Sequence, residues 1–455
     1  MSRLSSFLNR NPVLPLVLIL VLAIVFVVGP ILRKRLAVEW PHQRLMIEAV
    51  VISEPIVKEK VVVVDLLTTQ GHHKLRGRLA REPRSEQVRL GDGLQIRAYI
   101  NKVHAWQQGH FDYQRYMACH GFSGELMVRK GDWQQQQLPL SGLSLLERTK
   151  LRFLLWRHQL LDHYRQWGVT DEAYGVVAAM TLGEKSELDT SLKETYSLVG
   201  TSHILALSGL HLMIIYTVIT LLVGWRRFRM VSQVLIVLSI WAFAFLVGLS
   251  PSVVRAAFMI SIYALLSLGH RERMSVNTLA FTAIVMLLVN PLSLYDMGFQ
   301  LSFMAVLAIQ LFCPMLERVI PLHVQMEHRW LKAVWGLTSV SLAAQIGTAP
   351  LIAYYFGRFA SWFLLSNFVV IPLATLLLYL ALLSLCTCWW SGLQALLVSA
   401  LSFLVVLMNR LLEAIAQLPL CSIEGIRLTT LQLGCIYLFI GSVYVVLSLK
   451  SPRSR

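Results

Sequence analysis

Residues 200–212 read Gly-Thr-Ser-His-Ile-Leu-Ala-Leu-Ser-Gly-Leu-His-Leu, and they place polar side chains in a segment that otherwise has the composition of a membrane-spanning helix. His203 and His211 lie eight positions apart, about 80° around an α-helix, so they share a broad face. Ser208 and Gly209 lie between them. Because polar groups are unfavourable inside a bilayer, such residues are typical of a pathway or a site. The segment therefore predicts a polar site within a membrane domain.

The composition of the whole chain agrees with a membrane protein. Of its 455 residues, 56% are hydrophobic and 15% are charged, and the mean hydropathy is +0.60. Soluble domains carry about 25% charged residues. The formal net charge of +16 is partly explained by the basic loops that orient membrane proteins.

Apolar runs divide the chain into predicted spans. The first, Val13 to Leu32, has 20 residues, enough to cross a hydrocarbon core of about 30 Å. It is long for a cleaved signal peptide, and no small-residue cleavage site precedes Arg33-Lys34-Arg35. We therefore interpret residues 1–35 as an N-terminal membrane anchor. Nine further spans, about ten in total, are predicted at 201–223, 231–249, 250–268, 275–292, 296–316, 332–356, 361–388, 393–416 and 430–449.

The charges of the loops predict the orientation of these spans. With ten spans and a cytoplasmic N-terminus, four charge-rich segments fall on the cytoplasmic side, as the positive-inside rule requires. They are 225–229, 269–273, 317–332 and 450–455. Arg33-Lys34-Arg35 conflicts with this orientation, but the other loops outnumber it. The prediction is a multi-pass protein of the bacterial inner (plasma) membrane, with both termini cytoplasmic and the soluble domain extracytoplasmic.

Residues 36–142 have the pattern of a small all-β domain. Five short β-type runs, at 44–52, 57–68, 73–79, 94–102 and 124–129, are separated by Gly, Pro and polar clusters. This spacing is typical of a small barrel or sandwich, including the five-stranded OB type. Residues 143–199 then read as helices, and the first, 143–167, is amphipathic and basic, which predicts a position at the membrane interface. The fold class is therefore a polytopic α-helical membrane protein with a small OB-like domain after its first span.

The soluble domain is basic, which favours an anionic partner. Residues 33–150 contain 19 Lys and Arg against 12 Asp and Glu, a net charge of +7. Aromatic residues interleave with basic ones over 106–116, and aromatic platforms beside cations hold single-stranded nucleic acid without sequence preference. A core role for the aromatics, with the charges on a solvated face, is the alternative. The candidate DNA-binding residues are Lys74, Arg76, Arg78, Arg97, Lys102, Trp106, Tyr113, Arg115 and Tyr116.

Further polar residues fall within or beside other predicted spans. Arg255 follows Ser250-Pro-Ser252, where it could snorkel to the interface, bind a passing phosphate, or pair with an acid such as Asp296. Prolines at or within spans are tolerated where a helix borders a cavity. The predicted channel seam comprises His203, Ser208, Gly209, His211, Arg255, Asp296, Gln300, Ser302, Gln345 and Asn367.

Several chemistries lack their motifs in this sequence. There is no Gly-x4-Gly-Lys-[Ser/Thr] loop for ATP and no Gly-x-Ser-x-Gly nucleophile elbow. The two histidines of 200–212 have no third metal ligand at a recognisable spacing. We therefore expect no metal, no cofactor and no catalytic residue.

Four segments resemble the ComEC family of competence proteins. They are His203-Ile-Leu-Ala-Leu-Ser-Gly-Leu-His211, Gly248-Leu-Ser-Pro-Ser-Val-Val-Arg-Ala256, Gly298-Phe-Gln-Leu-Ser-Phe303 and Phe111-Asp-Tyr-Gln-Arg-Tyr116. The resemblance covers about residues 10–450 in the same order. It implies an OB-like external domain and, over 200–455, a transmembrane channel through which one strand of transforming DNA enters the cytoplasm. Many members add a C-terminal metallo-β-lactamase-type domain, which this sequence does not contain, so nuclease activity is not expected.

The predicted function is therefore uptake of single-stranded DNA. The basic domain would capture the strand and the helix bundle would conduct it across the lipid bilayer. The driving force would come from a cytoplasmic DNA motor or helicase, and an extracytoplasmic receptor would deliver the DNA. The alternatives are an intramembrane enzyme or small-anion transporter that uses His203, Ser208 and His211, and a structural subunit of a larger assembly. An enzyme predicts convergence of these three residues with an acid, whereas a channel predicts a continuous seam.

Overall fold

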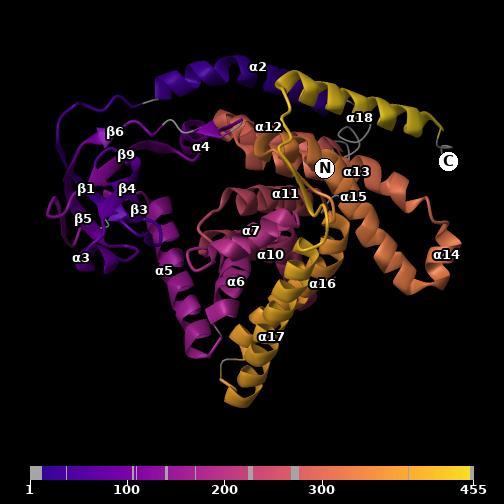
Figure 1. The fold of residues 1–455 in the computed structure, drawn as a ribbon. Helices are drawn as coiled ribbons and strands as arrows, with labels where there is room; N and C mark the ends of the chain where they lie inside the picture. The colour runs from indigo at the N-terminus through magenta and orange to yellow at the C-terminus, as the bar shows by residue number, and fades with distance from the viewer. Residues whose placement is uncertain are drawn as a thin grey trace.

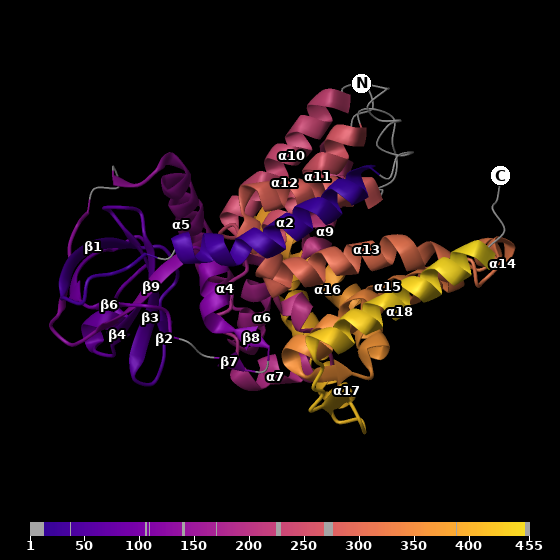
Figure 2. The ribbon, with the colours of Figure 1, turned by 90° about the horizontal axis from the view of Figure 1, so that it is seen from above.

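A computed structural model describes residues 13–36, 38–104, 107–108, 110–138, 142–169, 171–223, 229–267, 276–387 and 389–450. The chain is mostly helical, with a β-sheet region near its N-terminus (Figure 1). The large sheet near the N-terminus lies at one side of the molecule and most of the helices at the other, and this separation persists when the molecule is seen from above (Figure 2).

The β-region is a curled sheet whose hydrophobic side chains alternate along its strands. Its strands are β1 Leu45–Val51, β2 Ile56–Val57, β3 Val61–Thr68, β4 Lys74–Ala80, β5 Gly93–Ala98, β6 Ile100–Asn101, β9 Phe122–Val128 and β10 Trp133–Gln135. The order is β10-β5-β1-β3-β4-β9-β6, with β4 and β9 parallel and the other pairs antiparallel. Only Tyr99 separates β5 from β6, so one stretch of chain pairs with β1 and then with β9. The predicted strands are confirmed within a few residues, and β10 is additional.

Small elements complete this region. The helix α3 (Pro83–Glu86) follows β4, and α4 (Tyr113–Cys119) follows the two-residue strands β7 (Gln107–Gln108) and β8 (Phe111–Asp112). Asp112 caps α4 by accepting a hydrogen bond from the Arg115 N–H at 2.9 Å. This cap starts the helix within the Phe111–Tyr116 motif.

The helix α5 (Leu145–Gln166) joins the sheet to the helical domain. Ser144 and Glu147 form a capping box at its start. One face, including Leu151 and Leu154, packs against Val50 and Leu67 of the sheet, and the helix also contacts α10. The predicted amphipathic helix is confirmed, whereas its position relative to a membrane stays a prediction.

The helical domain follows the predicted segments closely. After α2 (Val13–Leu36) and α5, its elements are α6 Asp171–Leu182, α7 Thr190–Leu198, α8 Ser202–Leu205, α9 Gly209–Val223, α10 Arg229–Leu246, α11 Pro251–Ser267, α12 Val276–Val289, η3 Pro291–Tyr295, α13 Met297–Glu317, α14 Leu322–Glu327, α15 Arg329–Phe356, α16 Phe363–Cys386, α17 Ser391–Ala416 and α18 Thr430–Lys450. A short sheet pairs β11 (Arg358–Ala360) with β12 (Ser422–Glu424).

Among the described residues, five helices are long and apolar enough to cross a membrane. They are α13, α15, α16, α17 and α18, while α2, α6 and α9–α12 have shorter apolar segments of 10–17 residues. The structure therefore supports a membrane protein, and the count of ten spans stays a prediction. The pairs α13–α15 and α16–α17 point in different directions, and α2 lies along α12 (Figure 1).

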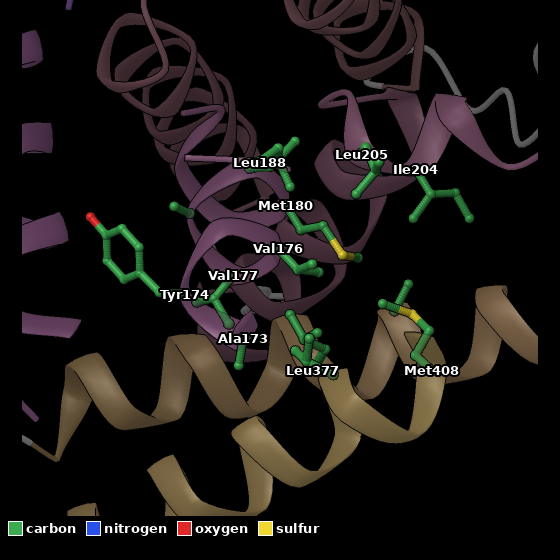
Figure 3. Packing of buried hydrophobic residues seen from close by; sticks show 14 of the residues in the cluster. Ala173, Tyr174, Val176, Val177, Met180, Leu188, Ile204, Leu205, Leu377 and Met408 are labelled. Carbon is green, nitrogen blue, oxygen red and sulfur yellow. The ribbon is translucent and has the colours of Figure 1, made fainter. Parts of the chain in front are cut away.

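The largest hydrophobic cluster lies where α6, α7, α8, α16 and α17 meet. Met180 and Val176 of α6 face Leu377 of α16 and Met408 of α17, while Leu205 of α8 borders the same cluster (Figure 3). This cluster anchors α8, and with it the start of the 200–212 segment.

One prediction is wrong: residues 201–223 do not form a single helix. The helix stops at Leu205 and restarts at Gly209, so residues 206–208 are not helical. The predicted angle of about 80° between His203 and His211 therefore does not apply, because it assumes one continuous helix.

Candidate functional site

The site is built around the break between α8 and α9. Ser252, near the start of α11, donates a hydrogen bond from Oγ to the Leu207 carbonyl oxygen at 2.7 Å. A Cβ on Gly209 would lie 3.8 Å from the Ala256 Cβ, so α9 starts in close contact with α11. The segments 203–211 and 248–256, two of the four that resemble the ComEC family, thus meet here. The Ser252 hydroxyl satisfies the Leu207 carbonyl oxygen, which the broken helix leaves without a partner in the helix.

His211 is fully buried beside Ser208. Its Nδ1 lies 2.9 Å from the Ser208 Oγ and accepts a hydrogen bond from the Ser208 backbone N–H at 3.2 Å. Since Nδ1 is an acceptor, the neutral ring carries its hydrogen on Nε2, and Nε2 is buried without a partner among the described residues. His203 is exposed on the short helix α8, although it lies close enough to interact electrostatically with His211.

The Ser208–His211 pair resembles a nucleophile and its base, but the described residues supply no third group. In a catalytic triad, the second ring nitrogen of the histidine is oriented by an acid. In the described part of the chain, no hydrogen-bond partner contacts Nε2 of His211. His203, Ser208 and His211 are therefore neighbours without the acid that the enzyme alternative predicts.

Arg255 and Asp296 form a buried ion pair between α11 and α13. The Arg255 Nη1 lies 3.5 Å from the Asp296 Oδ2, and the two side chains are 7% and 10% exposed. Asp296 also caps α13, since its Oδ2 accepts a hydrogen bond from the Phe299 N–H at 3.0 Å. Of the alternatives for Arg255, the structure supports pairing with Asp296.

The remaining seam residues lie on α13, α15 and α16. Gln300 donates from Nε2 to the Leu294 carbonyl oxygen at 2.8 Å, and its Oε1 accepts a hydrogen bond from the Tyr355 hydroxyl at 2.8 Å. Ser302, Gln345 and Asn367 are half-buried, and their side chains make no hydrogen bond to the residues that the structure describes. Within the described ranges, the seam is a set of separate polar positions rather than one bonded network.

The segment around α4 docks the β-region on the helical domain. The His110 ring stacks on Tyr354 of α15 with centroids 3.9 Å apart, and its Nε2 lies 2.7 Å from the Leu428 carbonyl oxygen. At the other end of α4, the Cys119 thiol contacts the Leu292 carbonyl oxygen at 3.2 Å. Arg115 lies over the ring of Tyr295, 5.8 Å from its centroid.

Tyr113 and Tyr116 are engaged within the protein and are only partly exposed, so they do not form an open aromatic platform. Tyr113 accepts a hydrogen bond from Arg76 at 3.2 Å and donates one to Glu125 at 3.2 Å. Tyr116 is half-buried, and burial together with the carboxylate of Asp296 raises the pKa of its hydroxyl. Both side chains are thus less available to DNA than the pattern predicts.

The basic candidates fall into two groups. Arg97, Lys102 and Arg115 are exposed, whereas Lys74, Arg76 and Arg78 are half-buried. Arg76 pairs with Asp65 at 2.9 Å and Arg78 with Glu125 at 3.5 Å. Lys74 lies 3.9 Å from the centroid of Phe122, and burial lowers its pKa to about 8. Trp106 lies outside the described residues.

The sequence patterns missed a second buried ion pair. Arg157 of α5 contacts Glu184 at 2.9 Å, and His158 lies 3.3 Å from Glu54 of the β-region. No local pattern in the sequence marked Glu184 as the partner of Arg157. No group of three or more His, Cys, Asp and Glu that could hold a metal occurs within the described ranges.

Comparison with known proteins identifies the class that this fold and site define. The competence protein family matches residues 180–452, more than half of the chain. The chain therefore belongs to the ComEC-type competence protein family.

Two relatives are similar over part of their length. ComE operon protein 3 of Bacillus subtilis (strain 168) is 29% identical over 278 residues, which is 60% of this chain and 32% of that protein. An uncharacterized protein of Aquifex aeolicus (strain VF5) is 30% identical over 205 residues, which is 44% of this chain and 45% of that protein. The chain thus matches less than half of either relative. No solved structure matches it.

Proposed function

We propose that this protein is a membrane channel that takes single-stranded DNA into the cytoplasm during transformation. Membership of the competence protein family supports a role in DNA uptake. The observation that carries the channel proposal is the connection between basic residues of the sheet and the polar site of the helical domain. Arg76 bonds Tyr113 of α4, Tyr116 of the same helix is close enough to Asp296 to be affected by its charge, and Asp296 pairs with Arg255.

We further propose that the β-region is an OB-like module that binds the strand outside the membrane. Its order β5-β1-β3-β4-β9-β6, the parallel β4–β9 pair and the short link from β5 to β6 support a small closed barrel. The exposed cations Arg97 and Lys102 are its best candidates for phosphate contacts.

The remaining parts of the proposal concern the cell. The protein would lie in the inner membrane with both termini in the cytoplasm, following the charges of its loops. A cytoplasmic motor would pull the strand and an extracytoplasmic receptor would supply it, because the sequence has no ATP-binding loop of its own.

The test is complementation of a naturally competent bacterium that lacks its own ComEC-type protein. Restored transformation and cytoplasmic accumulation of labelled DNA are the expected results. Replacing His211 and Arg255 together should abolish both while the protein still reaches the membrane. Unchanged uptake by that double variant would contradict a channel through this site.

The Ser208–His211 contact at 2.9 Å favours a second candidate, an intramembrane hydrolase. A fluorophosphonate probe should then label the wild-type protein and not the Ser208→Ala variant. Absence of labelling, with DNA uptake intact, supports the channel instead.

A further inference from the structure

Arg255 is a buried cation with too few partners. A guanidinium group has five N–H donors and no way to lose its charge in a protein. Here the side chain is 7% exposed, its contact with Asp296 is a single one of 3.5 Å, and its buried Nε has no hydrogen-bond partner in the part of the chain that the structure describes. Bidentate Arg–carboxylate pairs are shorter, about 2.8 Å. The site therefore has unused capacity for an anion.

The first turn of α13 faces the same point. Helix N-termini present free N–H groups and a partial positive charge to anions. A Cβ on Gly298, the second residue of this helix, would lie 3.2 Å from the Arg255 Nη2 and 3.1 Å from the Asp296 Oδ2. The absence of a side chain at Gly298 thus leaves the guanidinium in direct contact with the helix N-terminus.

Asp296 occupies this anion-binding position from within the chain. Its carboxylate accepts from the Phe299 N–H at 3.0 Å and contacts Arg255, which are two interactions that a phosphate oxygen makes equally well. Tyr116 of α4 lies close enough to be affected by the Asp296 charge, so the helix that docks the β-region also borders this point.

We propose that Arg255 and the first turn of α13 form an exchange site for a phosphodiester anion, which Asp296 occupies when no strand is present. This inference rests on the proposed function. It identifies Arg255 as one position at which the phosphodiester groups of the transported strand bind. An arriving phosphate displaces the carboxylate from Arg255, and the carboxylate replaces the phosphate as the strand moves on. Because the internal anion is always available, no phosphate stays bound for long.

The test measures binding and passage with the full-length protein in nanodiscs and in proteoliposomes. Asp296→Asn removes the charge but keeps an N-cap residue for α13. Without the competing Asp296 carboxylate, this variant should bind a fluorescent oligothymidylate through Arg255 roughly tenfold more tightly than the wild type does, and release it more slowly. The double variant Asp296→Asn with Arg255→Gln should lose this gain. Glu317→Gln, which removes an exposed acid at the other end of α13, is the matched control and should leave affinity unchanged.

The outcomes separate the exchange site from the channel. Equal oligothymidylate affinity of the wild type and Asp296→Asn overturns the exchange site, even if DNA still crosses the membrane. A different result is that the oligonucleotide binds none of the proteins, while pyrophosphate binds Asp296→Asn more tightly than the wild type and loses this gain with Arg255→Gln. The anion site is then supported and the proposed function is contradicted. Nanodiscs of neutral and anionic lipid are compared. If Asp296→Asn binds the oligothymidylate more tightly than the wild type only in neutral lipid, the headgroups of the anionic lipid compete for the site. That result assigns the site to lipid phosphate and overturns the DNA assignment.

Discussion

Single residues of this protein carry structural and functional roles that their type alone does not distinguish. His211 illustrates this, since its Nδ1 accepts the N–H of Ser208, the last residue of the break between α8 and α9. Its buried Nε2 has no partner in the described structure. One nitrogen thus stabilises the broken helix, while the other is free to meet a ligand.

The first prediction separates these two roles of His211. An asparagine amide oxygen can replace Nδ1 as acceptor, whereas phenylalanine cannot. His211→Phe should therefore destabilise the protein by about 1–3 kcal/mol through the unsatisfied Ser208 N–H, and His211→Asn should destabilise it less. Thermal unfolding in detergent measures both. Equal loss in the two variants would show that the hydrogen bond to Ser208 contributes little.

The second prediction follows from the pKa of Lys74, which burial lowers from 10.5 to about 8. Below about pH 8 the folded chain holds a buried charge, whereas the unfolded chain keeps its proton up to the ordinary pKa. The contribution of Lys74 to the free energy of unfolding therefore rises with pH between about 8 and 10.5.

Lys74→Met keeps the aliphatic stem and removes the charge. This variant should be more stable than the wild type near neutral pH, and the difference should shrink as the pH approaches 10.5. Thermal unfolding across that range measures the difference, with Lys130→Met on an exposed turn as the control. A difference that does not change with pH would exclude the buried charge as its cause.

At the scale of elements, close packing of α13 on α15 depends on a small residue. A Cβ on Gly347 of α15 would lie 2.6 Å from both the Ala308 Cβ and the Met304 carbonyl oxygen of α13. Tyr437 of α18 also donates a hydrogen bond to the Gly347 carbonyl oxygen at 2.8 Å. Three membrane helices therefore meet at this glycine.

The third prediction compares two glycines of α15. Gly347→Ala should force α13 and α15 apart and lower stability by about 1–3 kcal/mol. Gly336→Ala meets no atom within 4 Å, so it should stabilise the helix by up to about 1 kcal/mol. Thermal unfolding of both variants, and cross-linking of cysteines placed on α13 and α15, test the difference. A stable Gly347→Ala variant with unchanged cross-linking would refute the close contact.

At the scale of the whole molecule, the β-region and the helical domain are joined by two contact regions. In the first region, His110 and α4 contact α15 and η3. In the second, α5 packs on the sheet and binds the helical domain through the Arg157–Glu184 ion pair. From above, α4 lies between the strands and the membrane helices (Figure 2). These contacts place α4 beside η3, directly before the N-terminus of α13.

The fourth prediction tests the α4 contact in the intact protein. His110→Ala with Arg115→Ala removes the stacking on Tyr354 and the cation over Tyr295, so α4 should exchange its amide hydrogens faster. Hydrogen exchange by mass spectrometry measures this, and Lys130→Ala on an exposed turn is the control. Unchanged protection of α4 would mean that other contacts hold the two parts together.

Local sequence patterns determined the helices and strands of this protein. Periodicity and hydropathy located α5, the apolar helices from α10 onward and five β-runs within a few residues, because these signals act over one turn or one strand. They also selected most of the polar side chains at the site, since a charged or amide residue in an apolar segment is visible without any structure.

Only the tertiary structure decided which of these residues meet. The break at 206–208 is stabilised by Ser252 from another helix, Gln300 bonds Tyr355 across 55 positions, and the exposed His110 ring stacks on Tyr354 of α15. Each contact joins residues far apart in the chain, so no local periodicity encodes it. The physical reason is that burial and hydrogen bonding are satisfied over the whole packed chain, and a helix breaks or a cation pairs where a distant group offers a better partner.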